Sequence, residues 1–284
     1  MHWQMETIGA LIAFLLGFVL TLSIREKMLQ MIVNSGFTRP NFKGCAIPLS
    51  AGVIFFIVLA PASIPFILLG DNDIRGAILL YLFAAAGASL LGIMDDFWGA
   101  RDISGLLGHF KALAGGKLTT GAVKALGGGL LALAVGAFLF PGQPWRILDS
   151  ALIIALSTNM LNLFDLRPGR AGKMFILLYL ALVPFFAGTV PAVPASIIFG
   201  SLLAFLPADI KARAMMGDAG SNTLGVVIGV TAAASLDGYY RVGFMTMLIL
   251  IHVITEKYSL TRIIAANKVL HFLDMLGREK GPGR

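Results

Sequence analysis

Long apolar segments recur along the whole chain and decide what it can fold into. A helix that crosses a bilayer needs about 20 mostly apolar residues. Segments of this size are separated here only by short clusters of charge, Gly and Pro, and 57% of the 284 residues are apolar while 13% are charged. The sequence therefore predicts an all-α, polytopic transmembrane helix bundle of about nine spans. The expected spans are 7–24, 47–69, 76–94, 122–140, 147–164, 173–189, 193–207, 219–236 and 241–256, so that residues 1–256 form the bundle and 257–284 a basic amphipathic cytoplasmic tail.

The basic residues predict the orientation of this bundle. When the connections are assigned alternately to the two sides, all 22 Lys and Arg except Arg75, Arg146 and Arg241 fall on one side. The positive-inside rule makes that side cytoplasmic, which places the amino terminus outside and the carboxyl terminus inside. The net charge of +7 then follows from membrane topology, and no nucleic-acid partner is expected.

Two segments on the inner side have apolar residues at helical spacing. One contains Leu106, Leu107, Phe110 and Leu113, and the other is the tail from 263 to 276. Both are predicted to lie at the membrane interface. The single cysteine, Cys45, has no partner for an internal disulfide and is predicted to be inert.

Carboxylates stand at the cytoplasmic ends of apolar spans. Asp95 and Asp96 end the third span in GIMDDFWG, and Asp218 opens the eighth in MMGDAGSNTLG. Charge at membrane depth costs at least about 2.5 kcal/mol, and adjacent carboxylates both stay ionised when a cation neutralises them. Magnesium is bound by carboxylates together with substrate phosphates, so we predict Mg²⁺ and a phosphorylated substrate. The alternatives are a solvated helix end for the Asp pair and a helix cap for Asp218.

A stripe of amides ends the fifth span. Asn159, Asn162 and Asp165 follow one another at intervals of three residues, which places them on one face of a helix. They could bind a polar ligand, or the amides could simply hydrogen-bond to a neighbouring helix. Arg167 and Arg170 come next; they satisfy the positive-inside rule, and their guanidinium groups also suit bidentate contact with phosphate.

Four blocks in this order resemble the polyprenyl-phosphate N-acetylhexosamine-1-phosphate transferase superfamily. The blocks are RPNFKGCAIPLSAG at 39–52, GIMDD at 92–96, NMLNLFD at 159–165 and MGDAGS at 216–221. The resemblance implies transfer of a sugar 1-phosphate from a UDP-linked amino sugar to a polyprenyl phosphate lipid, with release of UMP. It also implies Mg²⁺ as cofactor, the inner membrane of a prokaryote as location, and cell-envelope glycan synthesis, including peptidoglycan, as the pathway. A homodimer is left open.

The resemblance also implies roles for single residues. Asp95, Asp96 and Asp218 match the catalytic carboxylates, with Asp218 and Asp96 as metal ligands and Asp95 near the lipid phosphate. The expected substrate-binding residues are Lys43, Ser50, Asn159, Asn162, Asp165, Arg167 and Arg170.

Two departures from the family pattern support a rival interpretation. The family has a second Asp three positions after the first, where this chain has Pro168, and its His-rich loop near the carboxyl end is missing, since His252 and His271 stand in no matching motif. One rival is a catalytically silent, lipid-binding relative. A second rival does not depend on these departures: carboxylates at membrane depth together with helix-breaking Gly and Pro also mark an ion-coupled secondary transporter, which would place its polar residues near the bilayer midplane.

Overall fold

The computed structural model describes residues 2–99, 116 and 119–278, and it is a polytopic helix bundle with one small hairpin. The elements are α1 (His2–Asn34), β1 (Thr38–Pro40), β2 (Ala46–Pro48), the 3₁₀ helix η1 (Ala51–Val53), α2 (Ile54–Leu69), α3 (Asn72–Trp98), α5 (Thr120–Leu139), α6 (Pro144–Phe164), α7 (Arg170–Phe186), α8 (Ala192–Ile210), α9 (Gly217–Ser235), α10 (Gly238–Lys257), α11 (Leu260–Ala266) and α12 (Lys268–Met275).

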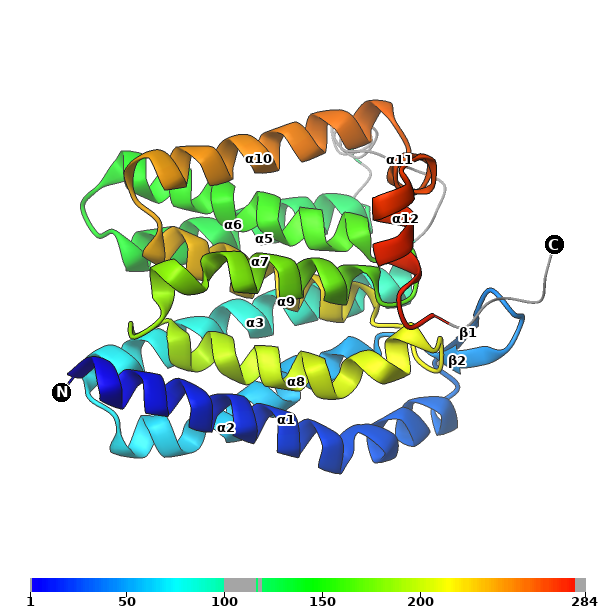
Figure 1. Ribbon diagram of the computed structural model, residues 1–284, viewed down its shortest axis with the longest axis horizontal. Coiled ribbons are helices and arrows are strands. Elements are labelled where there is room, and N and C mark those ends of the chain that lie inside the picture. The colour runs from blue at the N-terminus through cyan, green and yellow to red at the C-terminus, as the bar shows by residue number, and fades with distance from the viewer. Residues whose placement is uncertain (1, 100–115, 117–118, 279–284) are drawn as a thin grey trace.

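The long helices run side by side between two ends of the molecule (Figure 1). The amino terminus and the turns between α2 and α3, α7 and α8, and α9 and α10 lie at one end, and the hairpin, α11 and α12 lie at the other. Within the described residues, seven helices are long and apolar enough to cross a membrane. The other two long helices are α7, which has only 17 residues, and α9, whose first turn is polar. The all-α bundle is confirmed, while the number of spans and their orientation stay predictions.

Two helices extend beyond their predicted ends. The first span was expected to end at 24, but α1 continues to Asn34 because Met28 and Ile32 are buried against the bundle and the Arg25 guanidinium donates to the Ala204 carbonyl at 2.6 Å. α3 continues to Trp98. Asp95 and Asp96 therefore lie within its last turns rather than beyond its end.

The hairpin was not predicted, because its strands have only three residues each. β1 and β2 pair antiparallel, with Thr38 opposite Pro48. The segment before α9 bonds to the end of this hairpin: the Met215 amide donates to the Pro48 carbonyl at 2.8 Å, and the Ala51 amide donates to the Met215 carbonyl at 3.0 Å. The hairpin therefore holds the residues that lead into the first turn of α9.

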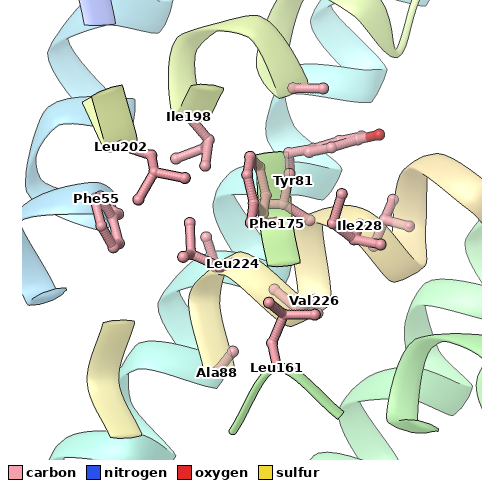
Figure 2. Packing of buried hydrophobic residues seen from close by; sticks show 14 of the residues in the cluster. Phe55, Tyr81, Ala88, Leu161, Phe175, Ile198, Leu202, Leu224, Val226 and Ile228 are labelled. Carbon is pink, nitrogen blue, oxygen red and sulfur yellow. The ribbon is translucent and has the colours of Figure 1, made fainter. Parts of the chain in front are cut away.

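α9 is the central helix, and almost all of its residues are buried. Leu224, Val226 and Ile228 pack among apolar side chains from several other helices (Figure 2). Glycines allow close helix crossings, since a Cβ at Gly225 would lie 2.4 Å from the Cα of Thr158 on α6. Because α9 is enclosed in this way, the position of its first turn relative to α3 and α6 is closely defined.

The tail forms two short helices that meet at Asn267, whose side chain accepts hydrogen bonds from the Val269 and Leu270 amides and so caps α12. Val269 and Phe272 are exposed on α12, and the position of the tail at the membrane interface stays a prediction. The other predicted interfacial helix, at 106–113, lies outside the described residues.

Candidate active site

The four acidic residues singled out in the sequence come together at one end of the bundle. Asp95 and Asp96 lie in the last turns of α3, Asp218 in the first turn of α9, and Asp165 at the carboxyl end of α6. The approach of α3 to α9 depends on Gly92, where an added Cβ would lie 2.4 Å from the Asp218 carbonyl carbon. The close crossing therefore brings the carboxylates of both helices into one site.

Asp96 is the buried member of this group, with 8% of its surface exposed. Its carboxylate accepts a hydrogen bond from the Ser50 hydroxyl and one from the Ala219 amide at 3.3 Å. Gly217, with φ +70°, lies so close that a Cβ there would be 2.6 Å from Asp96 Oδ2. Only glycine meets both the conformation and the space at this position.

Asp95 and Asp218 share a cation. The Lys124 ammonium on α5 bonds the Asp218 carboxylate and lies 3.5 Å from Asp95 Oδ2. An ammonium between two carboxylates offsets their mutual repulsion. Sequence reasoning missed this residue, because its charge was ascribed to membrane orientation alone.

The amide stripe on α6 faces the same place. Asn162 Nδ2 donates to the Ser221 hydroxyl of α9 at 3.1 Å, and that hydroxyl donates to the Gly217 carbonyl at 3.1 Å. This interhelical hydrogen bond was the alternative to ligand binding. Asn162 also lines a cavity, as Asn159 does, and ligand binding by either amide stays a prediction.

A cavity of about 280 Å³, which we call the polar pocket, opens between the hairpin, the 165–168 turn and the start of α9. It contains both acidic and basic side chains. The charged residues that line it are Arg39, Asp96, Asp165, Arg167, Asp209 and Asp218.

A second cavity of about 470 Å³, which we call the membrane cleft, lies between α3, α5, α6 and α9. Asp95, Lys124 and Asn162 line one part of it, whereas Leu131 and Ile154, further along their helices, line its apolar part. The two cavities adjoin at the ion pair between Lys124, which lines the cleft, and Asp218, which lines the polar pocket. A cavity with several charged lining residues and a cavity with a partly apolar lining therefore meet at this ion pair.

Asp165 is surrounded by other acidic groups. Burial raises the pKa of its carboxyl group well above the usual range, and the charges of Asp209, Asp218 and Asp96 raise it further. A ligand or ion that brings positive charge into the polar pocket would lower this pKa again.

The other predicted substrate-binding residues are placed as follows. Ser50 bonds Asp96 and Arg167 lines the polar pocket, whereas Lys43 lies in the hairpin connection and lines neither cavity. Arg170 differs from the prediction: its guanidinium is buried against Asp274, and it is not among the described residues that line either cavity.

Sequence reasoning also missed Asp209. This carboxylate is buried at the end of α8, lines the polar pocket and accepts a hydrogen bond from the Gly169 amide at 3.0 Å. It stands at the end of an apolar span, as the acidic residues that were singled out also do. The same criterion, applied to every span, would have found it.

Residues 78–236, from α3 to the end of α9, match the model of glycosyl transferase family 4. The match covers more than half of the chain and contains all four converging carboxylates. The chain belongs to glycosyl transferase family 4.

Curated relatives of this chain align with nearly its whole length, well beyond the residues that match the family model. The phospho-N-acetylmuramoyl-pentapeptide-transferase of Thermotoga maritima is 25% identical, over 93% of this chain and 87% of the relative. Proteins of the same name from Clostridium beijerinckii and Staphylococcus saprophyticus are 27% and 26% identical, over 95% and 98% of this chain and 86% and 92% of the relatives. This family-4 transferase is therefore a divergent relative that aligns with them along almost their full length.

Proposed function

We propose that this protein transfers a phospho-sugar unit, with phospho-N-acetylmuramoyl-pentapeptide as the first candidate, from a UDP carrier to a polyprenyl phosphate and releases UMP. The names of the relatives support this substrate class. The observation that carries the proposal is the junction of the two cavities at the Lys124–Asp218 pair. A reaction between a charged nucleotide and a membrane lipid needs such a junction, and the bacterial relatives favour a prokaryotic inner membrane as its place.

In the proposed reaction the lipid chain lies in the membrane cleft and the nucleotide diphosphate in the polar pocket. An oxygen of the lipid phosphate attacks the β-phosphorus, a new P–O bond forms, and the bond to the leaving UMP breaks. Phosphoryl transfer depends mainly on positioning and charge neutralisation. Asp95, which lines the cleft beside Lys124, would accept the proton of the lipid phosphate; direct attack by the Asp95 carboxylate is the less favoured variant.

Magnesium belongs to this proposal as the cofactor. The site offers carboxylate oxygens, the ligands that Mg²⁺ prefers, and Mg²⁺ usually takes only one or two of them together with substrate phosphates. The described part of the chain contains no cluster of three or more His, Cys, Asp or Glu suited to a metal, so a cage made of protein alone is not expected. Asp218 and Asp96 would hold the ion, which when bound would neutralise the charge of the diphosphate.

The direct test uses the purified full chain in detergent with polyprenyl phosphate, MgCl₂ and radiolabelled UDP-N-acetylmuramoyl-pentapeptide or UDP-N-acetylhexosamines. We expect UMP and a lipid-linked product, both lost on chelation of Mg²⁺. Asp95→Asn should slow turnover by about 10²–10⁴-fold. Asp73→Asn is the matched control, because it changes an exposed Asp at the other end of the same helix.

Absence of lipid-linked product with all of these donors would overturn the proposal and favour the silent, lipid-binding relative. The transporter interpretation has less support, because the acidic groups gather where α3 and α6 end and α9 begins, at one end of the bundle. Normal turnover by Asp95→Asn would remove this residue from the chemistry while leaving the transferase itself in place.

A further inference from the structure

A buried cluster of ion pairs joins the carboxyl-terminal tail to the start of α7. Arg170 and Asp274 are only 5% and 8% exposed, and Arg170 donates to both Asp274 carboxylate oxygens, at 2.8 and 2.9 Å. Arg278 donates to the same two oxygens, at 2.7 and 2.9 Å. We call Arg170, Asp274 and Arg278 the tail latch.

The charges of the tail latch favour the ion pairs seen in the structure. Burial alone would raise the pKa of the Asp274 carboxyl group, but hydrogen bonds and charge from the two guanidinium groups lower it below the usual range. Bidentate contacts between a guanidinium and a carboxylate are also among the stronger and more directional hydrogen bonds in proteins. The position of α12 on the bundle is therefore closely defined.

The latch reaches beyond the tail to the turn between α6 and α7. Arg278 Nε donates to the Pro168 carbonyl at 2.7 Å, and on the other side of the turn the Gly169 amide donates to Asp209 at 3.0 Å. A Cβ at Gly169 would lie 2.3 Å from Ile210 Cγ1, so the turn has little free space. Its backbone is held by the tail from one side and by α8 from the other.

This turn forms one wall of the polar pocket. Asp165, Leu166, Arg167 and Pro168 all line that cavity. Arg167 is exposed. The position of its guanidinium relative to a bound phosphate therefore depends on the position of the turn. Arg170, two residues beyond Pro168, is instead used to bind the tail.

We propose that the tail latch positions the 165–169 turn for binding of the nucleotide diphosphate donor, which makes Asp274 and Arg278 positioning residues of the polar pocket. The inference rests on the proposed function, because it takes the polar pocket as the donor site. It assigns to the tail a part in donor affinity, not in the chemical step. A tail that is only an anchor would instead affect stability without any preference between the two substrates.

The first test is Asp274→Asn, which keeps the shape of the side chain and removes the charge that holds both guanidinium groups. We expect the KM for the UDP-sugar to rise by about tenfold or more, with kcat and the KM for polyprenyl phosphate changed by less than about threefold. Asp274→Glu, which restores the charge, should recover most of the donor affinity.

The matched control is Asp149→Asn. The Asp149 carboxylate also bonds a buried arginine, Arg241, from α6 to α10, but it lies at the other end of the bundle, near the α9–α10 turn. This variant loses the same kind of ion pair and should melt at a lower temperature, with both KM values unchanged. Equal increases in the two KM values of Asp274→Asn, or none, would overturn the proposal.

Arg278→Gln decides the question if Asp274→Asn is not recovered folded. It leaves the Arg170–Asp274 pair in place and removes the contact with Pro168, so the donor KM should still rise selectively. An unchanged donor KM in this variant would refute the positioning role.

Hydrogen–deuterium exchange of the full chain gives a readout that does not need activity. Peptides covering 165–170 should exchange faster in Asp274→Asn than in the wild type, whereas Asp149→Asn should leave them unchanged. If the wild type itself makes no product, the transferase proposal fails, and faster exchange would still support the latch as the element that orders the turn. Unchanged exchange would overturn it.

Discussion

Replacing Gly92 by alanine would test whether the reaction depends on the crossing of α3 and α9. The added methyl group would lie 2.4 Å from the carbonyl carbon and oxygen of Asp218, whereas ordinary contact begins at 3.4 Å. The backbones at this crossing must therefore separate by about 1 Å, at a cost of about 1–3 kcal/mol for overpacking. Asp95 and Asp96 follow Gly92 within about one helical turn, so the separation would change their distance from Asp218.

A misplacement of about 1 Å at reacting groups costs on the order of 10²-fold in rate. We therefore expect Gly92→Ala to lower kcat by about that factor, measured as UMP release, and to lower the melting temperature in detergent. Gly76→Ala is the matched control on the same helix, because the nearest atom to its methyl group in the described part of the chain would be Phe138 Cζ, at 4.0 Å. Since alanine favours helix over glycine by about 1 kcal/mol, this control should melt no lower than the wild type. A Gly92→Ala protein with kcat within about twofold of the wild type would refute the reasoning.

Three further predictions concern polar contacts of the site. Ser50→Ala removes a donor to the buried Asp96 carboxylate and should lower the free energy of unfolding in denaturant titrations by about 1–3 kcal/mol. Ser63→Ala should lower it less, because the Ser63 hydroxyl donates to the Leu59 carbonyl of its own helix. Lys124→Met leaves two carboxylates without their shared cation and should reduce UMP release by about 10²-fold. Lys124→Arg should recover part of the activity, and full activity in Lys124→Met would contradict the prediction. Because its surroundings raise the pKa of Asp165, the folded state binds this proton more tightly than the unfolded state, and stability falls as pH rises from the usual Asp range toward the raised pKa. Asp165→Asn should therefore flatten this decline and raise the melting temperature at neutral pH, and identical melting curves across pH would count against it.

The sequence predicted the bundle and the meeting of four carboxylates, because both depend on local signals. Apolar length identifies spans, and Asp95, Asp165 and Asp218 are conspicuous at the ends of apolar runs. Their convergence could be argued from the side of the membrane on which each run ends. The ends of α1 and α3 were placed less well, since tertiary burial, and not the first charged residue, decides where a helix stops.

Pairings between distant parts of the chain left no local signal. Lys124 looks like any basic residue at the start of a helix on the predicted cytoplasmic side, and only the fold shows that it bonds Asp218, 94 positions away. Arg170 looked like a phosphate ligand, and only the docked tail shows that Asp274 occupies its guanidinium. The sequence shows the sign of a charged residue and predicts the side of the membrane on which it lies. Packing determines which residue it pairs with.

The two cavities differ in a way that would sort the two substrates of the proposed reaction. A nucleotide diphosphate carries charge that is costly to bring into an apolar environment, so the part of the membrane cleft lined by Leu131 and Ile154 disfavours it. A polyprenyl chain in the polar pocket would lie beside charged side chains such as Asp165 and Arg167. Each substrate then has one compatible site, and the linings of the two sites meet at the Lys124–Asp218 pair and at the neighbouring residues Asp95 and Asp96. Selection by solvation would then place the lipid phosphate near Asp95, which lines the cleft, and the diphosphate near Asp96 and Asp218, which line the polar pocket, so that the two phosphates would meet where the linings of the two cavities meet.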